Sequence, residues 1–218
     1  MRKFSFEVGE YYHIYNRGVD RRAIVADKYD SDRFMQCLLE FNNVELIGSI
    51  YENSFRKTQL GSLVPKSKNL VNIVCYCLNP NHFHLILEAV SEKWIEKFMH
   101  KVGSGYTSFF NNKYKRSGSL FQGTFKAKHV STNEYLKYLS AYINLNNQVH
   151  KIDGEISKLV RSSWNEYLEN KKGICSKQII LGQFKNKMDY KKYCLDSLPL
   201  LIENKNLSKE LKELGFEE

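Results

Sequence analysis

Apolar residues gather in three short runs that predict β-strands. Residues 11–17 combine aromatic and β-branched side chains, and residues 70–78 and 82–87 are rich in Val, Ile, Leu and Cys. The last two runs are separated by residues 79–81 (Asn-Pro-Asn), which are typical of a tight turn. The pattern therefore predicts a β-hairpin over residues 70–87 and a further strand close to the N-terminus.

Apolar residues at helical spacing predict three helices in the same part of the chain. The first has Ser31 as its N-cap and runs to about residue 44. The second begins at Ser91, and residues 103–105 (Gly-Ser-Gly) are expected to interrupt it. The third begins at Ser131, three residues before a Glu, which is the spacing of a capping box, and it runs to about residue 149.

Three segments depart from this pattern. Residues 45–69 lose the periodicity and contain Gly, Pro and scattered Lys, so we expect a long basic loop there. Residues 120–130 are interpreted as a strand bent at Gly123. Beyond residue 150 the pattern becomes helical with Lys-rich polar faces. We therefore divide the chain into a main α+β domain, residues 1–150, and a helical C-terminal extension, residues 151–218.

The composition favours a nucleic-acid partner. The chain has 33 Lys and Arg against 24 Asp and Glu, a formal net charge of +9, and 13% aromatic residues. Positive charge attracts a phosphate backbone and aromatic rings stack on bases, so the combination favours single-stranded nucleic acid. The five cysteines show no CxxC spacing, and no apolar run is long enough to span a bilayer. We expect a reduced, cytoplasmic protein without a membrane partner.

Basic and aromatic residues mix most densely between residues 113 and 130, which we interpret as the surface that faces nucleic acid. The alternative is a solvated, charged hairpin. The residues predicted to contact nucleic acid are Arg17, Lys113, Lys115, Arg116, Gln122, Lys126 and Lys128.

His82 and His84 are the first candidates for chemistry. Side chains at positions i and i+2 of a strand share one face, so the two imidazoles would point together and form half of a metal site. A cross-strand pair or buried, hydrogen-bonded histidines are the alternative. His13 could supply a third imidazole, although its aromatic neighbours also suit an ordinary sheet position.

The predicted helix over residues 131–149 carries a second candidate group. At about 100° per residue, Tyr135, Tyr138 and Tyr142 fall within a narrow arc, and Asn146 lies one turn beyond Tyr142. A tyrosine nucleophile and an amide ligand could thus share one edge of the helix. A tyrosine stripe that belongs to the core is the alternative.

Several segments, taken in order, resemble the single-tyrosine transposases of the HUH nuclease superfamily, particularly the REP-associated tyrosine transposases. The matching segments are residues 12–18 (YHIYNRG), 78–85 (LNPNHFHL), 120–126 (LFQGTFK), 142–146 (YINLN) and 162–164 (SSW) with Tyr167. The resemblance implies a ferredoxin-like fold. It also implies that His82 and His84 are metal ligands, that Tyr142 is the nucleophile and that Asn146 is the third ligand.

This chain departs from the family pattern at three places. Related transposases often have Gln where this chain has the shorter Asn146, and the family commonly has Pro at the position of Asn147. Asn79 stands where the family usually has Met, and we expect that difference not to affect the chemistry. Imidazole ligands alone would suit zinc, manganese or copper, whereas a phosphate-facing site completed by an amide and waters favours magnesium or manganese. The resemblance implies Mg²⁺ or Mn²⁺.

The function implied by the resemblance is metal-dependent nicking and rejoining of single-stranded DNA beside a hairpin or palindromic element. Tyr142 would attack the phosphate and leave a 5′-phosphotyrosine and a free 3′-hydroxyl. A monomer is favoured over a homodimer, because the chain carries the C-terminal extension. Two other functions stay open. One is a non-catalytic nucleic-acid-binding module on the same fold, and the other is a zinc hydrolase, although this sequence lacks the HExxH signature.

Overall fold

The computed structural model describes residues 5–53, 68–169 and 173–213. The main domain consists of β1 (Tyr11–Arg17), the 3-10 turn η1 (Val19–Arg21), α1 (Lys28–Glu40), β2 (Val71–Leu78), β3 (His82–Ala89), α3 (Trp94–Lys113), β4 (Lys126–Val130), α4 (Asn133–Asn144) and α5 (Asn146–Val149). The strands form one antiparallel sheet in the order β4-β1-β3-β2-β5. A β-α-β-β-α-β succession with β1 and β3 inside the sheet is the ferredoxin-like arrangement, so the predicted α+β fold is confirmed.

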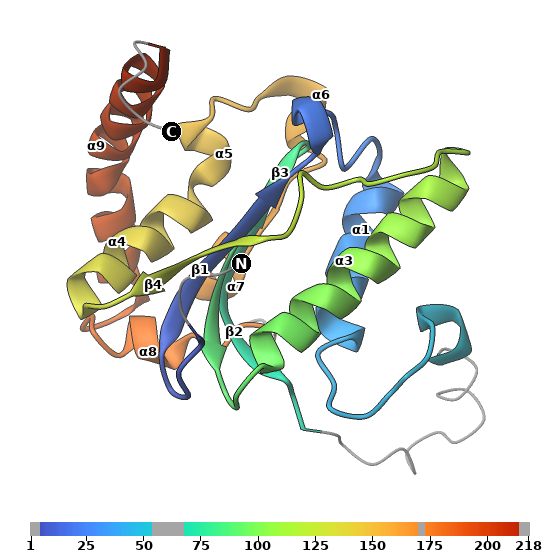
Figure 1. Cartoon of the computed structure of the whole chain (residues 1–218). Coiled ribbons are helices and arrows are strands. Elements are labelled where there is room, and N and C mark those ends of the chain that lie inside the picture. The colour runs from blue at the N-terminus through green and yellow to red at the C-terminus, as the bar shows by residue number, and fades with distance from the viewer. Residues whose placement is uncertain (1–4, 54–67, 170–172, 214–218) are drawn as a thin grey trace.

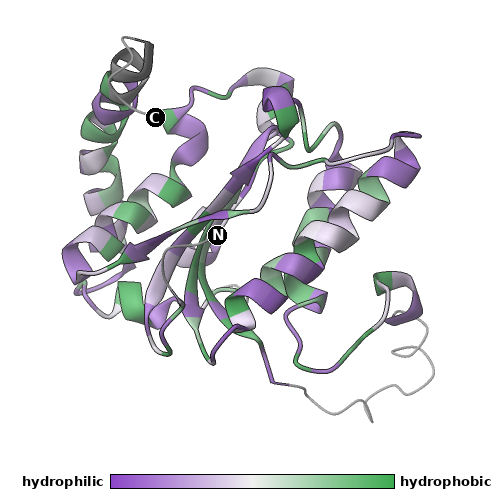
Figure 2. Cartoon of the chain, in the orientation of Figure 1, coloured by the Kyte–Doolittle hydropathy of each residue, from purple (hydrophilic) through white to green (hydrophobic). Residues whose placement is uncertain are grey.

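Helices cover both faces of the sheet. Figure 1 shows α1 and α3 on one face and α4, α5 and α9 on the other. β3 contributes side chains to the hydrophobic cores on both faces of the sheet. Phe83, Leu85 and Leu87 lie in the core beneath α1 and α3, and Ile86 lies in the core beneath α4. In Figure 2 β2 is mostly hydrophobic in colour and β1 mostly polar, and the two colours alternate along the helices, as expected for helices packed on a sheet.

The C-terminal segment adds helices and an edge strand. Its elements are α6 (Gly154–Ser157), β5 (Arg161–Ser162), α7 (Trp164–Leu168), α8 (Gln178–Leu181) and α9 (Lys187–Glu213). β5 pairs with β2 through Cys77 and Ser162, and Tyr167 and Tyr190 are buried in the core beneath α4. The described residues of this segment thus share a hydrophobic core with the sheet. The boundary at residue 150 stays a prediction.

Two predicted helix starts were wrong because neighbouring side chains supply the caps. The cap of α1 is Asp27, whose carboxylate accepts a hydrogen bond from the backbone N–H of Asp30 at 2.9 Å, so Ser31 lies inside the helix. The cap of α4 is Thr132, whose hydroxyl accepts from the N–H of Tyr135 at 3.1 Å, so Ser131 lies before it.

Other expected boundaries also differ. The predicted start of the next helix at Ser91 is wrong, because α3 begins at Trp94, and the predicted interruption at residues 103–105 is wrong, because α3 is continuous to Lys113. The predicted helix to residue 149 is divided at Leu145, where α4 ends before α5 begins. β4 covers only residues 126–130 of the predicted strand, and Gly123 precedes it with a φ of +67°. Of the expected basic loop, residues 50–53 are helical, while residues 54–67 lie outside the described part of the chain.

Candidate active site

The two histidines of β3 share the sheet face that is covered by α4. Their ring centroids are 5.2 Å apart and their planes are nearly perpendicular, at 83°. Phe83, between them, points to the opposite core. Strand alternation therefore delivers the arrangement that the sequence predicted, with two partly exposed imidazoles on one rigid support.

Tyr142 of α4 lies beside this pair. Its ring centroid is 5.5 Å from that of His84, and the planes meet at 81°. The Tyr142 side chain is partly exposed, as a group that must reach a substrate needs to be. Tyr138, one turn earlier, instead accepts a hydrogen bond from the Asn204 amide of α9 at 2.9 Å. Of these two tyrosines, Tyr142 is therefore the one in contact with a histidine of β3.

Asn146 completes the group from the start of α5. It is fully buried, and its Oδ1 lies 3.2 Å from Nε2 of His82. Leu145 separates α4 from α5, and Asn146 is the first residue of α5, four residues after Tyr142. Its Nδ2 is buried without a hydrogen-bond partner among the described residues. The structure thus brings together all four residues of the predicted centre, His82, His84, Tyr142 and Asn146.

Hydrogen bonds define which nitrogen of His82 carries the proton. Its Nδ1 lies 2.6 Å from Oδ1 of Asn81, and the Asn81 amide is oriented by donating its Nδ2–H to the carbonyl of Arg21 at 3.3 Å. An oxygen acceptor at Nδ1 requires a proton there, so Nε2 of neutral His82 carries the lone pair. The Asn79 amide nitrogen, which can only donate, lies nearest to that lone pair, with Nδ2 2.9 Å from Nε2, and Oδ1 of Asn146 is farther away at 3.2 Å.

His13 orients the second imidazole. Its Nε2 lies 2.8 Å from Nδ1 of His84, and burial, aided by the charge of Lys128, lowers the pKa of His13 to about 4. A neutral His13 can accept the Nδ1–H of His84, which leaves a lone pair on Nε2 of His84. This is the usual relation between a metal-ligating histidine and its outer partner. Alternation along β1 placed His13 on a face, but only the strand register shows that this face is shared with His84.

The electrostatic environment keeps these imidazoles neutral. Burial lowers the pKa of His82, and burial with the charges of His13, His82 and His150 lowers the pKa of His84 well below its usual range. Neutral imidazoles are the form that binds metal. Burial also raises the pKa of Tyr142, and the adjacent Asn146 amide opposes that rise. The phenol therefore needs a nearby cation to ionise at neutral pH.

His150 is a neighbour that the sequence analysis did not single out. Its ring centroid lies 4.8 Å from that of His82, and its Nε2 is buried without a partner among the described residues. Burial, with the charges of His82 and Lys205, lowers the pKa of His150 to about 3. The only signal for it in the sequence was its position one turn beyond Asn146.

A divalent cation fits this group only if an amide oxygen is one of its ligands. In the described parts of the chain, no three His, Cys, Asp or Glu side chains surround a common metal position. His82 and His84 offer nitrogen lone pairs, and Asn146 offers a carbonyl oxygen within 3.2 Å of the first. Neighbouring ligands of octahedral Mg²⁺ lie roughly 3.0 Å apart. The spacing of these donor atoms is therefore compatible with a divalent cation.

Four of the residues predicted to contact DNA lie near the histidines. In the strand register Arg17 is opposite His82, and Lys126 and Lys128 are opposite Tyr15 and His13, so all three basic residues share the histidine face. Gln122 joins them by accepting a hydrogen bond from Nε of Arg17. The Lys128 ammonium lies 5.2 Å from the Tyr135 ring centroid.

The other three lie at the end of α3, which packs against the opposite sheet face. Lys113 binds the carboxylates of Asp27 and Asp30 at 2.6 and 2.7 Å. Arg116 packs over the Phe110 ring at 5.6 Å, and Lys115 is exposed. The structure therefore does not bring Lys113, Lys115 and Arg116 together with the histidines.

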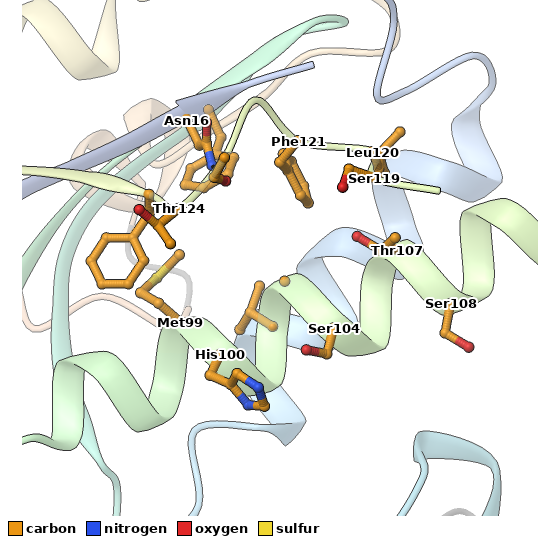
Figure 3. Close-up of a pocket in the computed structure, with 15 residues that line it drawn as sticks. Asn16, Met99, His100, Ser104, Thr107, Ser108, Ser119, Leu120, Phe121 and Thr124 are labelled. Carbon is orange, nitrogen blue, oxygen red and sulfur yellow. Dashed lines mark hydrogen bonds between the residues drawn. The ribbon is translucent and has the colours of Figure 1, made fainter. Parts of the chain in front are cut away.

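A cavity of about 510 Å³ lies between α3 and the segment leading to β4. Figure 3 shows Met99, Ser104 and Thr107 of α3 opposite Leu120 and Phe121 of that segment. Phe83, which points away from the histidine face, also lines it. The cavity is therefore separate from the tyrosine–histidine centre.

No helix in the described residues is long and apolar enough to cross a bilayer.

Comparison with known proteins relates both the site segment and the fold to others. Residues 64–148, which contain the β2–β3 hairpin and α4, match the family model described as "Transposase IS200 like". This match confirms the predicted resemblance for that segment. A solved structure, "Structure of the REP associates tyrosine transposase bound to a REP hairpin", has a similar fold, with a TM-score of 0.50, 12% sequence identity, and coverage of 80% of this chain and 88% of that chain. No curated protein matches the sequence.

Proposed function

From the IS200-like transposase segment at residues 64–148, we propose that this protein nicks and rejoins single-stranded DNA beside a hairpin, through a covalent bond to Tyr142. The observation that carries the proposal is the contact between Tyr142 and His84, with ring centroids 5.5 Å apart, in a chain with a formal charge of +9. The fold shared with a hairpin-bound transposase supports the choice of substrate.

In the proposed reaction Oη of Tyr142 attacks the scissile phosphorus. A phosphotyrosine bond forms, the bond from phosphorus to the 3′-oxygen breaks, and the phenolic proton passes in net terms to the departing 3′-hydroxyl. His82, His84 and Asn146 would hold Mg²⁺ or Mn²⁺, which supplies positive charge to the phosphate and to the ionising phenol. Attack by the 3′-hydroxyl of a second strand reverses these changes and rejoins DNA without hydrolysis.

The basic residues on the histidine face provide a path for the strand. Arg17, Lys126 and Lys128 project from neighbouring strands on the same side as the two imidazoles. Phosphates bound along this row would lead the chain past Tyr142. Contacts of this kind position the backbone without reading its sequence, which suits recognition of a folded strand by its shape.

The centre is proposed to work within a single chain. Tyr142 and His84 come from one polypeptide, and α9 holds the tyrosine helix in place. The Tyr190 hydroxyl accepts from the Asn144 amide at 2.8 Å and lies 3.2 Å from the Ser140 hydroxyl. These bonds join α4 to α9, and we propose a monomer in which this pair of helices packs on the sheet of its own chain.

The test is formation of a covalent protein–DNA adduct. The protein is incubated with single-stranded DNA bearing a hairpin and Mn²⁺, and the adduct is resolved on a denaturing gel. We expect Tyr142→Phe to abolish the adduct while hairpin affinity stays within about twofold, because only the attacking oxygen is removed. Tyr138→Phe is the matched control and should keep at least half of the adduct.

Hairpin binding by the wild type without any Mn²⁺-dependent adduct would refute the enzyme and leave the non-catalytic binding module. Loss of the adduct in Tyr138→Phe but not in Tyr142→Phe would show that the wrong tyrosine has been assigned.

A further inference from the structure

Asn79 lies at the centre of the proposed metal site rather than beside it. It occupies the turn between β2 and β3, is fully buried, and donates its backbone N–H to the carbonyl of His82 at 2.8 Å. Its side-chain Nδ2 lies 2.9 Å from Nε2 of His82 and 2.6 Å from Oδ1 of Asn146. One amide group therefore contacts two of the three proposed ligand atoms.

The chemistry of these atoms makes the contacts hydrogen bonds from Asn79. An amide NH₂ has two donor hydrogens, and here one can be given to the imidazole nitrogen and the other to the carbonyl oxygen. Asn146 Oδ1 has two lone pairs and can accept from Asn79 while it binds a cation. His82 Nε2 has a single lone pair, so a hydrogen bond from Asn79 and a metal bond exclude each other.

We propose, on the basis of the proposed metal-dependent function, that Asn79 is an internal competitor of the cation and thereby sets its affinity. In the metal-free protein the Asn79 amide donates to both ligands and holds them 3.2 Å apart, close to the spacing of neighbouring metal ligands. A cation that binds His82 displaces one of these hydrogen bonds. From the sequence we expected that Asn79, which stands where the family usually has Met, would not affect the chemistry. The contacts of its amide with His82 and Asn146 are the reason for the different role proposed here.

Direct measurement of Mn²⁺ binding tests this inference. Isothermal titration of the full chain with Mn²⁺ is compared between wild type and Asn79→Leu, which keeps the side-chain volume and removes the donor. We expect the variant to bind about 2- to 10-fold more tightly, the factor that corresponds to one hydrogen bond that no longer has to be broken. Asn79→Met, a second apolar replacement, should shift the affinity in the same direction and guards against a folding defect in the first.

The matched control is the same Asn-to-Leu substitution in β2, at the end of the strand far from Asn79. Asn72 of β2 donates its side-chain amide to Glu88 at 2.9 Å, at the other end of the hairpin, so Asn72→Leu should leave Mn²⁺ affinity unchanged. His82→Ala in the Asn79→Leu background should remove the gain, because the lone pair in question is lost. Equal or weaker binding by both Asn79 variants, with circular dichroism spectra like that of the wild type, would overturn the inference.

Adduct formation measured on the same proteins separates the two proposals. If wild type forms the Mn²⁺-dependent adduct but neither Asn79 variant binds Mn²⁺ more tightly, the role of Asn79 is wrong and the proposed function stands. If the variants bind more tightly and no adduct forms in any protein, Asn79 competes as proposed but the chemistry is wrong. If neither wild type nor variant binds Mn²⁺, both proposals fail.

Discussion

At the scale of single residues, burial shifts the pKa of Tyr142 and the pKa of the two β3 histidines in opposite directions. Burial raises the pKa of Tyr142, which disfavours the phenolate, and lowers the pKa of His82 and His84, which favours the lone-pair form. Both effects have one cause, since a low-dielectric environment disfavours any charge. If the proposed divalent cation binds between the phenol and the imidazoles, its charge lowers the pKa of Tyr142, and the neutral imidazoles are already in the form that binds it. We therefore expect the phenol to be inert until metal binds.

The role of His13 in orienting His84 leads to a prediction. His13→Leu removes the acceptor 2.8 Å from Nδ1 of His84, so the ring loses its fixed orientation and Mn²⁺ affinity should fall about 10- to 100-fold. Isothermal titration measures the change. His129→Leu, on the opposite sheet face where the imidazole pairs with Glu10, is the matched control and should bind Mn²⁺ as wild type does. Unaltered affinity in His13→Leu would refute its orienting role.

At the scale of elements, the strands could be predicted from the sequence because their signal is local. The run from Val71 to Leu78 is apolar on both faces, as a strand between two helical layers must be. Helix starts were less predictable, because Asp27 precedes Ser31 by four residues and Thr132 directly follows Ser131, and only the folded backbone decides which side chain is the cap. The roles of His13 and Asn79 depend on strand register and on a turn, which no local pattern contains.

Continuity of α3 through two glycines also has a tertiary cause. A Cβ added to Gly105 would lie 2.4 Å from the Phe41 ring, whereas one added to Gly103 would meet nothing within 4 Å. Gly105 therefore permits close packing of α3 against the end of α1, whereas Gly103 makes no such contact. The sequence suggested a break there because both glycines look alike without their surroundings.

These two glycines therefore predict opposite effects of the same substitution. Gly105→Ala should lower the free energy of unfolding by about 1–3 kcal/mol, because the methyl group overlaps Phe41. Gly103→Ala should raise it by up to about 1 kcal/mol, since alanine favours the helix and finds open space. Urea denaturation followed by circular dichroism measures both. Stabilisation by Gly105→Ala would contradict the close approach.

At the scale of the whole molecule, four histidines gather where the sheet, α4 and α5 meet. His13, His82, His84 and His150 all have a lowered pKa, because burial disfavours their charged forms. The unfolded chain, with histidines near pKa 6.5, therefore binds more protons than the folded chain in mildly acidic solution. Protonation linkage then makes the folded state less stable as pH falls.

The corresponding prediction concerns stability against pH. Above about pH 7.5, one unit above the pKa of an unfolded histidine, these histidines are largely neutral in both states and contribute little pH dependence. As pH falls from 6.5 towards 4, the free energy of unfolding should decrease, and His13, with a folded pKa of about 4, should alone account for about 3 kcal/mol at pH 4. Urea denaturation at half-unit pH steps measures the slope. His13→Leu should flatten it, and an unchanged slope in this variant would contradict the lowered pKa.

The proposed single-chain centre has a genetic consequence. The Tyr190 bonds join α4 to α9, and in the proposed monomer each molecule supplies both the attacking oxygen and the metal ligands. Two defective alleles, one without the phenol and one without the imidazoles, could then not complement each other in the same cell. Each copy would succeed or fail alone, and an inactive copy would harm an active one only by occupying its DNA.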